Sequence, residues 1–290
     1  SYRGGGVTSK RLRGARERKA LDSHGHQIIA YELQGGLYFA TAEQLVRRIV
    51  EDSPQSKYVL LDGRRISRAD QSALMLLRDL KLALAHESKV LVLAALPEQV
   101  QADWLKLNSG AGLELCFGDV DAALEYCETK VILTADPGAM AADALLPLAD
   151  MDILRGFSAD EIGKLAPYIQ TSSYDAGAFI IREGDAADRL YLLASGSASV
   201  DIVLDDAKSR VRLAAFRPGV AFGEFALFDG GRRVANVVAE TAAVCYVLDF
   251  ANLERLEATE PKLYRRVLFA LGRLLTDRLR RVTAEVRALT

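Results

Sequence analysis

The most informative stretch of this chain is Phe222-Gly-Glu-Phe-Ala-Leu-Phe-Asp-Gly-Gly-Arg-Arg-Val-Ala-Asn-Val-Val-Ala239, because it places a carboxylate and an arginine around a short apolar turn preceded by glycine. Gly223 lets the backbone come close to a ligand, and a helical turn from Phe225 would present free N–H donors to an anion. Arg233 can hold two phosphate oxygens, whereas Glu224 accepts hydrogen bonds only from a donor such as a ribose hydroxyl. One ligand satisfies all these groups: a phosphate close to a free 2′-hydroxyl, as in a 3′,5′-cyclic nucleotide.

This stretch resembles the phosphate-binding cassette of cyclic-nucleotide-binding domains, whose pattern is Phe-Gly-Glu, an apolar residue, Ala, Leu, a short spacer, Arg, a small residue, Ala, a short polar residue and Val. The resemblance implies that Glu224 binds the ribose and Arg233 the phosphate. The implied site consists of Gly223, Glu224, Phe225, Ala226, Leu227, Arg233, Val234, Ala235 and Asn236. Arg232 departs from a common proline, and Val234 from a usual Ala, Ser or Thr. Since Val234 lacks a hydroxyl, the pattern favours cyclic AMP over cyclic GMP, and both stay open.

The length and composition of the chain predict two domains. Half of the 290 residues are hydrophobic, so two domains of about 100 to 150 residues can each bury a core. Lys and Arg number 37 against 39 for Asp and Glu, which gives no overall bias toward nucleic acid or an anionic membrane. Residues 1–20 nevertheless hold one acid, Glu17, and seven bases. The bases are Arg3, Lys10, Arg11, Arg13, Arg16, Arg18 and Lys19. We expect 1–20 to be a solvated basic arm, with docking on an acidic partner or a membrane surface as the alternative.

No catalytic or metal site is expected within these residues. The cysteines lie far apart among apolar neighbours and are expected to be reduced core residues of a cytoplasmic protein; they are Cys116, Cys127 and Cys245. The histidines have no partner cysteines or acids at metal spacing; they are His24, His26 and His86. No nucleophile motif, P-loop, signal peptide or apolar run of about 20 residues occurs. Any catalytic or membrane portion is therefore expected outside this sequence.

Strands and helices alternate over residues 21–135, which predicts a mixed or parallel sheet covered by helices. Strands are expected at 27–33, 57–62, 89–94 and 113–117, and helices at 42–51, 71–85, 98–107 and 120–130. Thr41 and Gln44 have the spacing of a capping box, so a helix is expected to begin just after Phe39. The runs Tyr31-Glu-Leu-Gln-Gly-Gly-Leu-Tyr-Phe-Ala-Thr-Ala-Glu43 and Tyr58-Val-Leu-Leu-Asp62 resemble the STAS domain, named for sulfate transporters and anti-sigma-factor antagonists.

This second resemblance implies a regulatory or partner-binding loop at Asp70, Gln71 and Ser72. In antagonist members the loop carries Asp-Ser-Ser-Gly, and a kinase phosphorylates its first serine. Here Gln71 occupies the phosphoacceptor position and cannot gain the phosphate charges. Ser72 could substitute, but a serine at a helix start is more often a cap. We therefore expect a scaffold or docking domain without phosphoregulation.

Residues 136–150 are expected to link the domains, and 151–290 to form the second one. Asp136-Pro-Gly138 ends the preceding helix, 139–148 is expected to be a short linker helix, and Ser158 with Glu161 has capping-box spacing. Turn glycines then separate β-rich runs; they are Gly177, Gly184, Gly196 and Gly219. Strands at 179–181, 189–193, 198–202 and 244–248 predict an antiparallel β-barrel or jelly roll with flanking helices, as in cyclic-nucleotide-binding domains. The predicted fold class is therefore an α+β multidomain protein.

The helix expected after Pro261 carries a heptad-like seam of Leu275, Leu279, Val282, Val286 and Leu289. Arginines occupy its other faces; they are Arg273, Arg278, Arg280, Arg281 and Arg287. The seam could cover its own barrel or form a homodimer, and both stay open. In related domains this helix is a lid over the nucleotide and a dimer contact, so ligand binding could shift its packing.

A STAS domain followed by a cyclic-nucleotide barrel resembles the C-terminal regulatory part of two bacterial protein classes. One is the long form of glutaminase, and the other is the SulP anion transporter, where the domains form a cytoplasmic tail. Ser9-Lys-Arg-Leu-Arg13 and residues 31–43 are closer to the glutaminase version. The resemblance implies a non-catalytic sensor of a cyclic nucleotide, without a DNA-reading helix-turn-helix, that reports to an upstream catalytic or transport domain. A free-standing partner-switching protein is a third hypothesis, which Gln71 disfavours.

Overall fold

The computed structural model of the chain describes residues 2–3, 8–108, 115–140, 145–203 and 210–289. The chain divides into two compact units. Unit 1 consists of Ser1–Ser9 and Lys19–Ala139, and unit 2 consists of Lys10–Arg18 and Met140–Thr290. The chain therefore enters unit 2 at Lys10, returns to unit 1 at Lys19, and enters unit 2 again at Met140.

Unit 1 is built on a five-stranded mixed sheet in the order β1-β3-β4-β5-β6. The strands are β1 (Tyr2–Arg3), β3 (Ile28–Leu37), β4 (Tyr58–Ala69), β5 (Val90–Ala94) and β6 (Cys116–Phe117). β1 pairs antiparallel with β3, and the other pairs are parallel. The helices are α1 (Ala15–His24), which enters the unit, α2 (Phe39–Asp52), α3 (Gln71–His86), α4 (Glu98–Leu107) and α5 (Val120–Ala135). The alternation predicted for residues 21–135 is confirmed over the described residues; 113 and 114 of the last predicted strand lie outside them.

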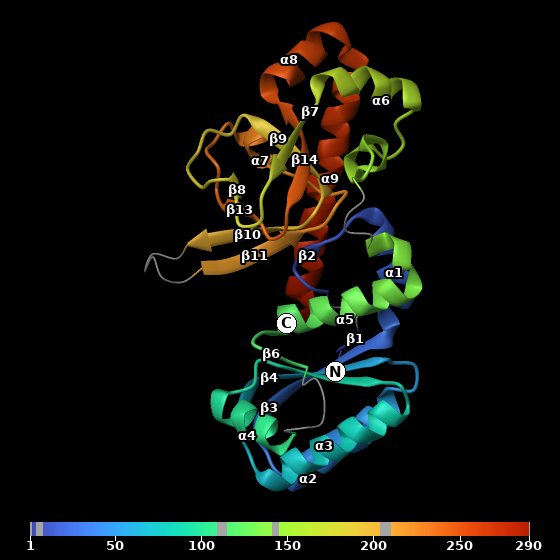
Figure 1. The fold of residues 1–290 in the computed structure, drawn as a ribbon, viewed down its shortest axis with the longest axis vertical. Coiled ribbons are helices and arrows are strands. Elements are labelled where there is room, and N and C mark those ends of the chain that lie inside the picture. Colours follow the sequence, from blue (N-terminus) through green and yellow to red (C-terminus); the bar gives the residue numbers. More distant parts are fainter. Residues whose placement is uncertain (1, 4–7, 109–114, 141–144, 204–209, 290) are drawn as a thin grey trace. The chain divides into compact units, whose positions relative to one another are not determined.

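Both faces of this sheet are covered, because side chains alternate along each strand. Ile29, Val59 and Leu91 belong to a core that also buries Trp104 and the inner faces of α2, α3 and α4. The neighbouring residues in the same strands, such as Ile28, Leu60 and Val92, lie on the opposite face and form a second core with α5. Figure 1 shows α2 and α3 on one side of the strands and α5 on the other. The helices therefore shield the sheet from solvent, while their outward faces stay exposed, as at Val50 of α2 and Met75 of α3.

Unit 2 contains two sheets packed face to face. One has the order β2-β11-β10-β13-β8, and the other has the order β12-β9-β14-β7. The first comprises β2 (Arg11–Leu12), β11 (Arg210–Phe216), β10 (Ala198–Val203), β13 (Asn236–Ala239) and β8 (Phe179–Ile181). The second comprises β12 (Ala221–Phe222), β9 (Arg189–Ser195), β14 (Ala243–Asp249) and β7 (Gln170–Tyr174). All pairs are antiparallel except β2 with β11, and Phe216, Phe222 and Cys245 lie in the core between the sheets.

Helices flank these sheets, as the sequence predicted. They are α6 (Ala159–Leu165), α7 (Phe225–Asp229), α8 (Phe250–Thr259) and α9 (Pro261–Leu289). The 3-10 turns found in the described parts of both units are η1 (Gly25–Gln27), η2 (Pro137–Met140), η3 (Leu148–Asp150), η4 (Asp152–Leu154) and η5 (Ala166–Tyr168). The predicted capping box is confirmed: Glu161 Oε2 accepts from the Ser158 amide at 2.7 Å, and Ser158 Oγ accepts from the Glu161 amide at 3.2 Å. The four predicted turn glycines all have φ between 80° and 99°.

The structure corrects two expectations, and a third falls partly outside the described residues. The start of α2 is Phe39, with Tyr38 as its N-cap, so that Thr41 is inside the first turn and accepts from the Tyr38 amide at 2.9 Å. The expected linker helix at 139–148 includes 141–144, which lie outside the described residues; 139 and 140 belong to η2, 148 belongs to η3, and 145–147 are irregular. The basic N-terminal arm is not solvated throughout, because Arg11 and Arg13 are only 8% and 2% exposed. Carboxylates of unit 2 stabilise both charges.

Candidate ligand-binding site

The cassette of residues 222–239 begins at the last residue of strand β12 and is held by aromatic packing. The Phe222 ring stacks on Tyr191 and Phe216, with ring centroids 5.3 Å and 4.9 Å away. Gly223 then turns the chain with a φ of +83°, and a Cβ at this position would lie 2.9 Å from Arg233 Nη1. The turn therefore needs glycine both for its backbone conformation and for the space that the arginine occupies.

Glu224 is completely buried, and an arginine outside the cassette binds it. Its Oε1 accepts a hydrogen bond from Arg278 Nη1 of α9, and Arg278 Nη2 donates to the carbonyl of Ala221. The other carboxylate oxygen of Glu224, Oε2, is buried and has no hydrogen-bond partner in the described structure. A buried carboxylate oxygen without a donor is costly, so this atom is suited to a donor that a ligand brings.

Arg233 is buried as well, with 7% of its surface exposed, and backbone carbonyls hold its guanidinium. Nη1 donates to Gly223 O at 3.0 Å, and Nη2 donates to Arg189 O at 2.7 Å. Burial lowers the pKa of Arg233 from its ordinary value. The guanidinium carbon also lies 5.8 Å from the centroid of the Tyr191 ring. Neutral carbonyls stabilise a cation less than an anion does, so this arginine would gain from a phosphate.

The other predicted cassette residues have different roles. Asn236 accepts from the Glu183 amide at 3.0 Å and so connects the cassette to a neighbouring turn. Ala235 is buried, whereas Phe225 and Val234 are 55% and 67% exposed. Leu227 packs against the core that includes α8 and α9. Ala226 is in the backbone of α7, and its side chain lies outside the described residues.

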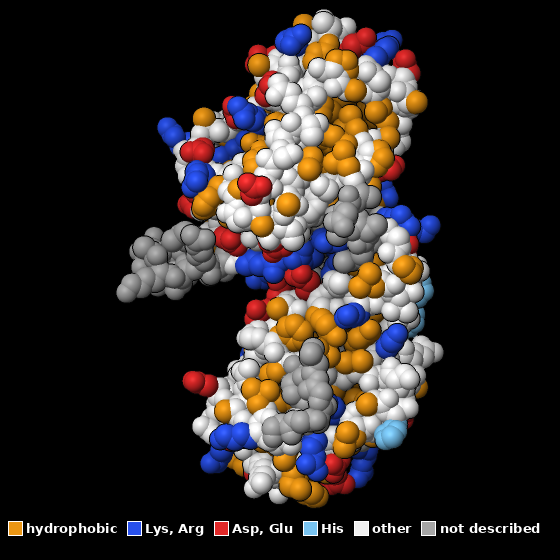
Figure 2. Space-filling model, viewed as in Figure 1, with side chains coloured by type: hydrophobic (Ala, Val, Ile, Leu, Met, Phe, Trp, Pro, Cys, Tyr) orange, Lys and Arg blue, Asp and Glu red, His pale blue; other side chains and the backbone are white. Residues whose placement is uncertain are grey.

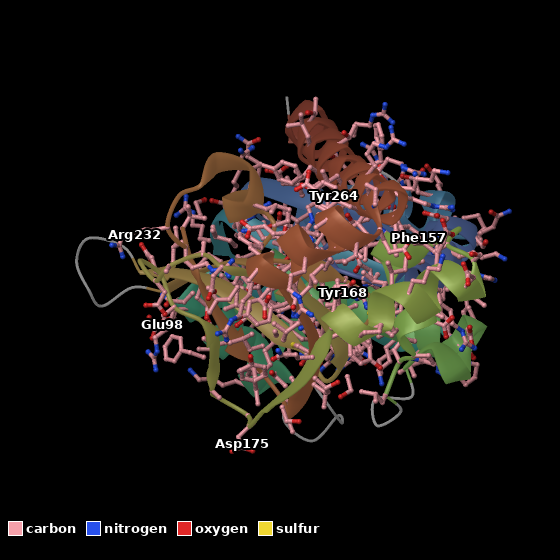
Figure 3. The ribbon with its side chains drawn as sticks, turned by 90° about the horizontal axis from the view of Figure 1, so that it is seen from above. Glu98, Phe157, Tyr168, Asp175, Arg232 and Tyr264 are labelled. Atoms are coloured by element: carbon pink, nitrogen blue, oxygen red, sulfur yellow. The ribbon has the colours of Figure 1, made fainter. Side chains whose placement is uncertain are left out.

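Arg232, which stands where proline is common, is bonded to the turn that contains Gly184 and Ala186. Its Nη1 donates to Gly184 O at 2.7 Å, and a β-bridge joins it to Ala186. Figure 3 shows Arg232 at the outer edge of the molecule. Its neighbour Arg233 exchanges backbone hydrogen bonds with Gly184 and Asp185, at 2.8 Å and 3.0 Å. These bonds fix the backbone from which the Arg233 side chain turns inward.

Arg278 is the site residue that sequence reasoning missed. The heptad pattern of α9 assigned it to a polar face, and 54 residues separate it from Glu224.

The predicted seam is only partly described: Leu275 is half-buried, Leu279 is 68% exposed, and the side chains of Val282, Val286 and Leu289 lie outside the described residues. Hydrophobic side chains do reach the surface of unit 2, as Figure 2 shows for one face, and Phe269 of α9 is 69% exposed. The homodimer stays a prediction.

The predicted loop of unit 1 lies at the start of α3. Asp70 is the N-cap, and its Oδ1 accepts from the Ala73 amide at 2.7 Å. Gln71 and Ser72 are exposed in the first turn. Ser72 therefore does not cap this helix, which corrects the sequence interpretation.

Among the residues with described placement, no group of three His, Cys, Asp or Glu side chains could hold a metal ion. The helices in that part of the chain include none that is both long and apolar enough to cross a membrane. Burial raises the pKa of the Cys127 and Cys245 thiols to about 12, with the adjacent Glu128 adding to the shift at Cys127.

Two families match this chain in succession. Residues 21–116 match the STAS domain, and residues 171–260 match the cyclic nucleotide-binding domain. The chain therefore carries a STAS domain followed by a cyclic nucleotide-binding domain, as the sequence motifs predicted.

Relatives of known name match nearly the whole chain. Glutaminase 1 of Bradyrhizobium diazoefficiens is 30% identical over 97% of this chain, and Glutaminase 2 of the same organism is 28% identical over 98%. The chain spans 45% of the length of each of these relatives. A crystal structure of a cyclic nucleotide-binding domain from Methylobacillus flagellatus is 32% identical, with a TM-score of 0.42, and covers 46% of this chain and 73% of that chain.

Proposed function

We propose that this chain is a non-catalytic regulatory module that binds a cyclic nucleotide, cyclic AMP in preference to cyclic GMP, and modulates an activity attached to it. The observation that carries the proposal is the buried Glu224 carboxylate, which has one oxygen on Arg278 and the other without a donor. A ribose 2′-hydroxyl is such a donor, and a small neutral group fits a buried position better than a second cation does.

Arg233 supplies the other half of the proposed recognition. Its guanidinium would leave the carbonyls of Gly223 and Arg189 and hold the cyclic phosphate, because a charged acceptor makes stronger hydrogen bonds than a neutral one. The exposed Val234 supports the preference for cyclic AMP, since it has no hydroxyl to bind a guanine edge. We propose that the rest of the cassette adds further contacts through its backbone and side chains; these residues are Gly223, Phe225, Ala226, Leu227, Val234, Ala235 and Asn236.

The attached activity that we propose is a bacterial glutaminase. Both glutaminase relatives align over nearly all of this chain and extend beyond it, which supports a shared regulatory region joined to a catalytic domain. The alternative is the cytoplasmic tail of a SulP-type anion transporter. The polypeptide preceding Ser1 distinguishes them: a hydrolase domain supports the glutaminase, and a run of transmembrane helices supports the transporter. We place the module in the cytoplasm, at the inner face of the membrane in the transporter case.

Titration calorimetry with cyclic AMP tests the binding proposal. We expect saturable binding to the 290-residue chain, weaker binding of cyclic GMP, and at least about a tenfold loss for Glu224→Gln or Arg233→Ala, since each removes a hydrogen bond to a charged group. Glu254→Gln and Arg265→Ala are matched controls at exposed helix positions and should bind like the unmodified chain. The proposal fails if neither nucleotide binds at millimolar concentration.

A further inference from the structure

Unit 2 incorporates a segment of chain that precedes the STAS domain in sequence. Residues Lys10–Arg18, hereafter the inserted segment, belong to unit 2, while Ser1–Ser9 and Lys19–Ala139 on either side of it belong to unit 1. Its leading end continues from Ser9, whose amide and hydroxyl donate to Glu128 of α5 at 2.7 Å and 2.6 Å. Its trailing end continues along α1. The inserted segment is therefore covalently joined to unit 1 at both ends.

Backbone pairing places the inserted segment on the edge of a sheet. β2 lies parallel to β11, with Arg11 opposite Ala215. The Arg217 amide donates to Leu12 O at 3.0 Å. Gly14 then lies so close to the turn after β11 that a Cβ on it would be 2.4 Å from the carbonyl oxygen of Pro218. Strand addition of this kind is a recognised mode of peptide binding, here used within one chain.

Buried charges fix the segment in this position. Arg11 pairs with Glu240 at 3.0 Å, and Glu240 also pairs with Arg212 at 3.1 Å. Glu17 pairs with Arg13 and with Arg217, each at 3.2 Å. Because Arg13 and Glu17 are almost fully buried, separating them from their partners would be costly. The segment is thus bound specifically and not only by its basic charge.

Asp152 of η4 holds the end of the inserted segment. Its Oδ1 accepts from the Ala15 amide at 2.9 Å, and its Oδ2 pairs with Arg18 at 2.6 Å. Its own amide donates to Gly219 O at 3.0 Å. A carboxylate at the first turn of a helix satisfies a free N–H and favours the positive end of the helix dipole. The start of α1 therefore depends on Asp152.

The inserted segment also shares a pocket with α9. Leu12, Arg13 and Arg18 line one part of it, and α9 contributes Arg278 together with Ala270, Arg273, Leu274 and Asp277. The η4 turn, which holds the segment through Asp152, packs against α9 as well. Helix α9 therefore lines a pocket together with the inserted segment and is also bonded to the buried Glu224. A movement of α9 at the cassette would change a wall of this pocket.

We propose that the inserted segment is the output element of the nucleotide-binding domain, an inference that rests on the function proposed above. Glu224 has no exposed surface, so a ligand reaches it only when a neighbouring group moves, and Arg278 is bonded to it from α9. Withdrawal of Arg278 displaces the part of α9 that lines the shared pocket and loosens the inserted segment. The change reaches unit 1 through the covalent connections at Ser9 and Lys19.

Amide hydrogen exchange and calorimetry on the 290-residue chain test this inference together. Saturating cyclic AMP should speed the exchange of amides in residues 10–18. Coupling is reciprocal, so Asp152→Asn, which loosens the segment, should tighten cyclic AMP binding about fivefold or more, whereas the exposed control Asp160→Asn should leave it unchanged. Glu240→Gln, which loosens the segment from its other end, should shift the affinity in the same direction and serves if Asp152→Asn does not fold.

The outcomes separate the two proposals. If cyclic AMP binds but exchange in residues 10–18 stays the same and Glu240→Gln binds with unchanged affinity, the output role is refuted and the binding function stands. If the segment exchanges more slowly with ligand, the proposed loosening is also refuted. If the unmodified chain binds neither cyclic nucleotide, the binding function itself fails, and this inference fails with it.

Discussion

Arg278 and Glu224 bond side chain to side chain although 54 residues separate them in the sequence. The glutamate is completely buried and the arginine side chain is 19% exposed, so the pair lies at the boundary between the cassette and solvent. The same guanidinium also donates to the carbonyl of Ala221, the first residue of β12. Helix α9 is therefore bonded both to Glu224 of the cassette and to Ala221 of β12.

Removing this arginine should destabilise unit 2. Arg278→Ala leaves the Glu224 carboxylate buried without its cation, and we expect a loss of about 2 kcal/mol in the free energy of unfolding, less than for a fully buried pair because Arg278 is partly exposed. Denaturant unfolding measures the loss. Arg280→Ala, an exposed neighbour on α9, should change it by less than about 0.5 kcal/mol. Equal losses in the two variants would mean that the pair contributes nothing.

A methyl group at Gly223 should be worse tolerated than one at another glycine of similar conformation. Gly223 and Gly177 have φ values of +83° and +82°, but a Cβ would meet Arg233 Nη1 at 2.9 Å in the first case and nothing within 4 Å in the second. We expect Gly177→Ala to cost about 1 kcal/mol from backbone strain, and Gly223→Ala about 1 to 3 kcal/mol more from crowding. Thermal unfolding compares them. Similar losses would show that the arginine can move aside freely.

The capping box of α6 should make a pH-dependent contribution to stability. The Ser158 amide, with help from Arg266, lowers the pKa of Glu161 below its ordinary value. Because the folded pKa is depressed, this stabilisation is present above the unfolded pKa of about 4.3 and is lost as the pH falls through the folded value. The melting temperature of Glu161→Gln should therefore lie below that of the unmodified chain at pH 7, and the gap should narrow toward pH 3.

A glutamate outside the capping box serves as the control for Glu161→Gln. Glu257→Gln changes an exposed glutamate of α8 and should show no gap that depends on pH. A gap for Glu161→Gln that stays constant from pH 7 to pH 3 would show that the glutamate acts by packing and not by its charge.

Sequence patterns located the cassette because its chemistry is local. Glu224 and Arg233 lie within one short stretch, and Gly223, which has a positive φ, directly precedes Glu224. The alternating elements of residues 21–135 were also recognisable, since periodic side chains record which face of each element is buried. Asp70 rather than Ser72 caps α3, and this choice was ambiguous in sequence because both residue types favour a helix start.

The inserted segment could not be found in this way. It lies within residues 1–20, whose seven bases and one acid have the composition of a solvated arm. The acids that neutralise Arg11 and Arg18 are Glu240 and Asp152, which are remote in sequence. No periodicity marks a two-residue strand such as β2. The pairing depends on an edge of β11 that exists only after unit 2 has folded.

The two successive domains, the cassette and the glutamine in place of a serine at position 71 were all readable from the sequence, because each depends on residues close together in the chain. The tertiary structure alone decided that Arg278 binds Glu224, that one oxygen of Glu224 has no donor, and that Lys10–Arg18 joins unit 2. These relations join residues that are far apart in sequence. The packing of the elements determines which residues that are distant in sequence become buried together or hydrogen-bonded. No local sequence pattern carries that information.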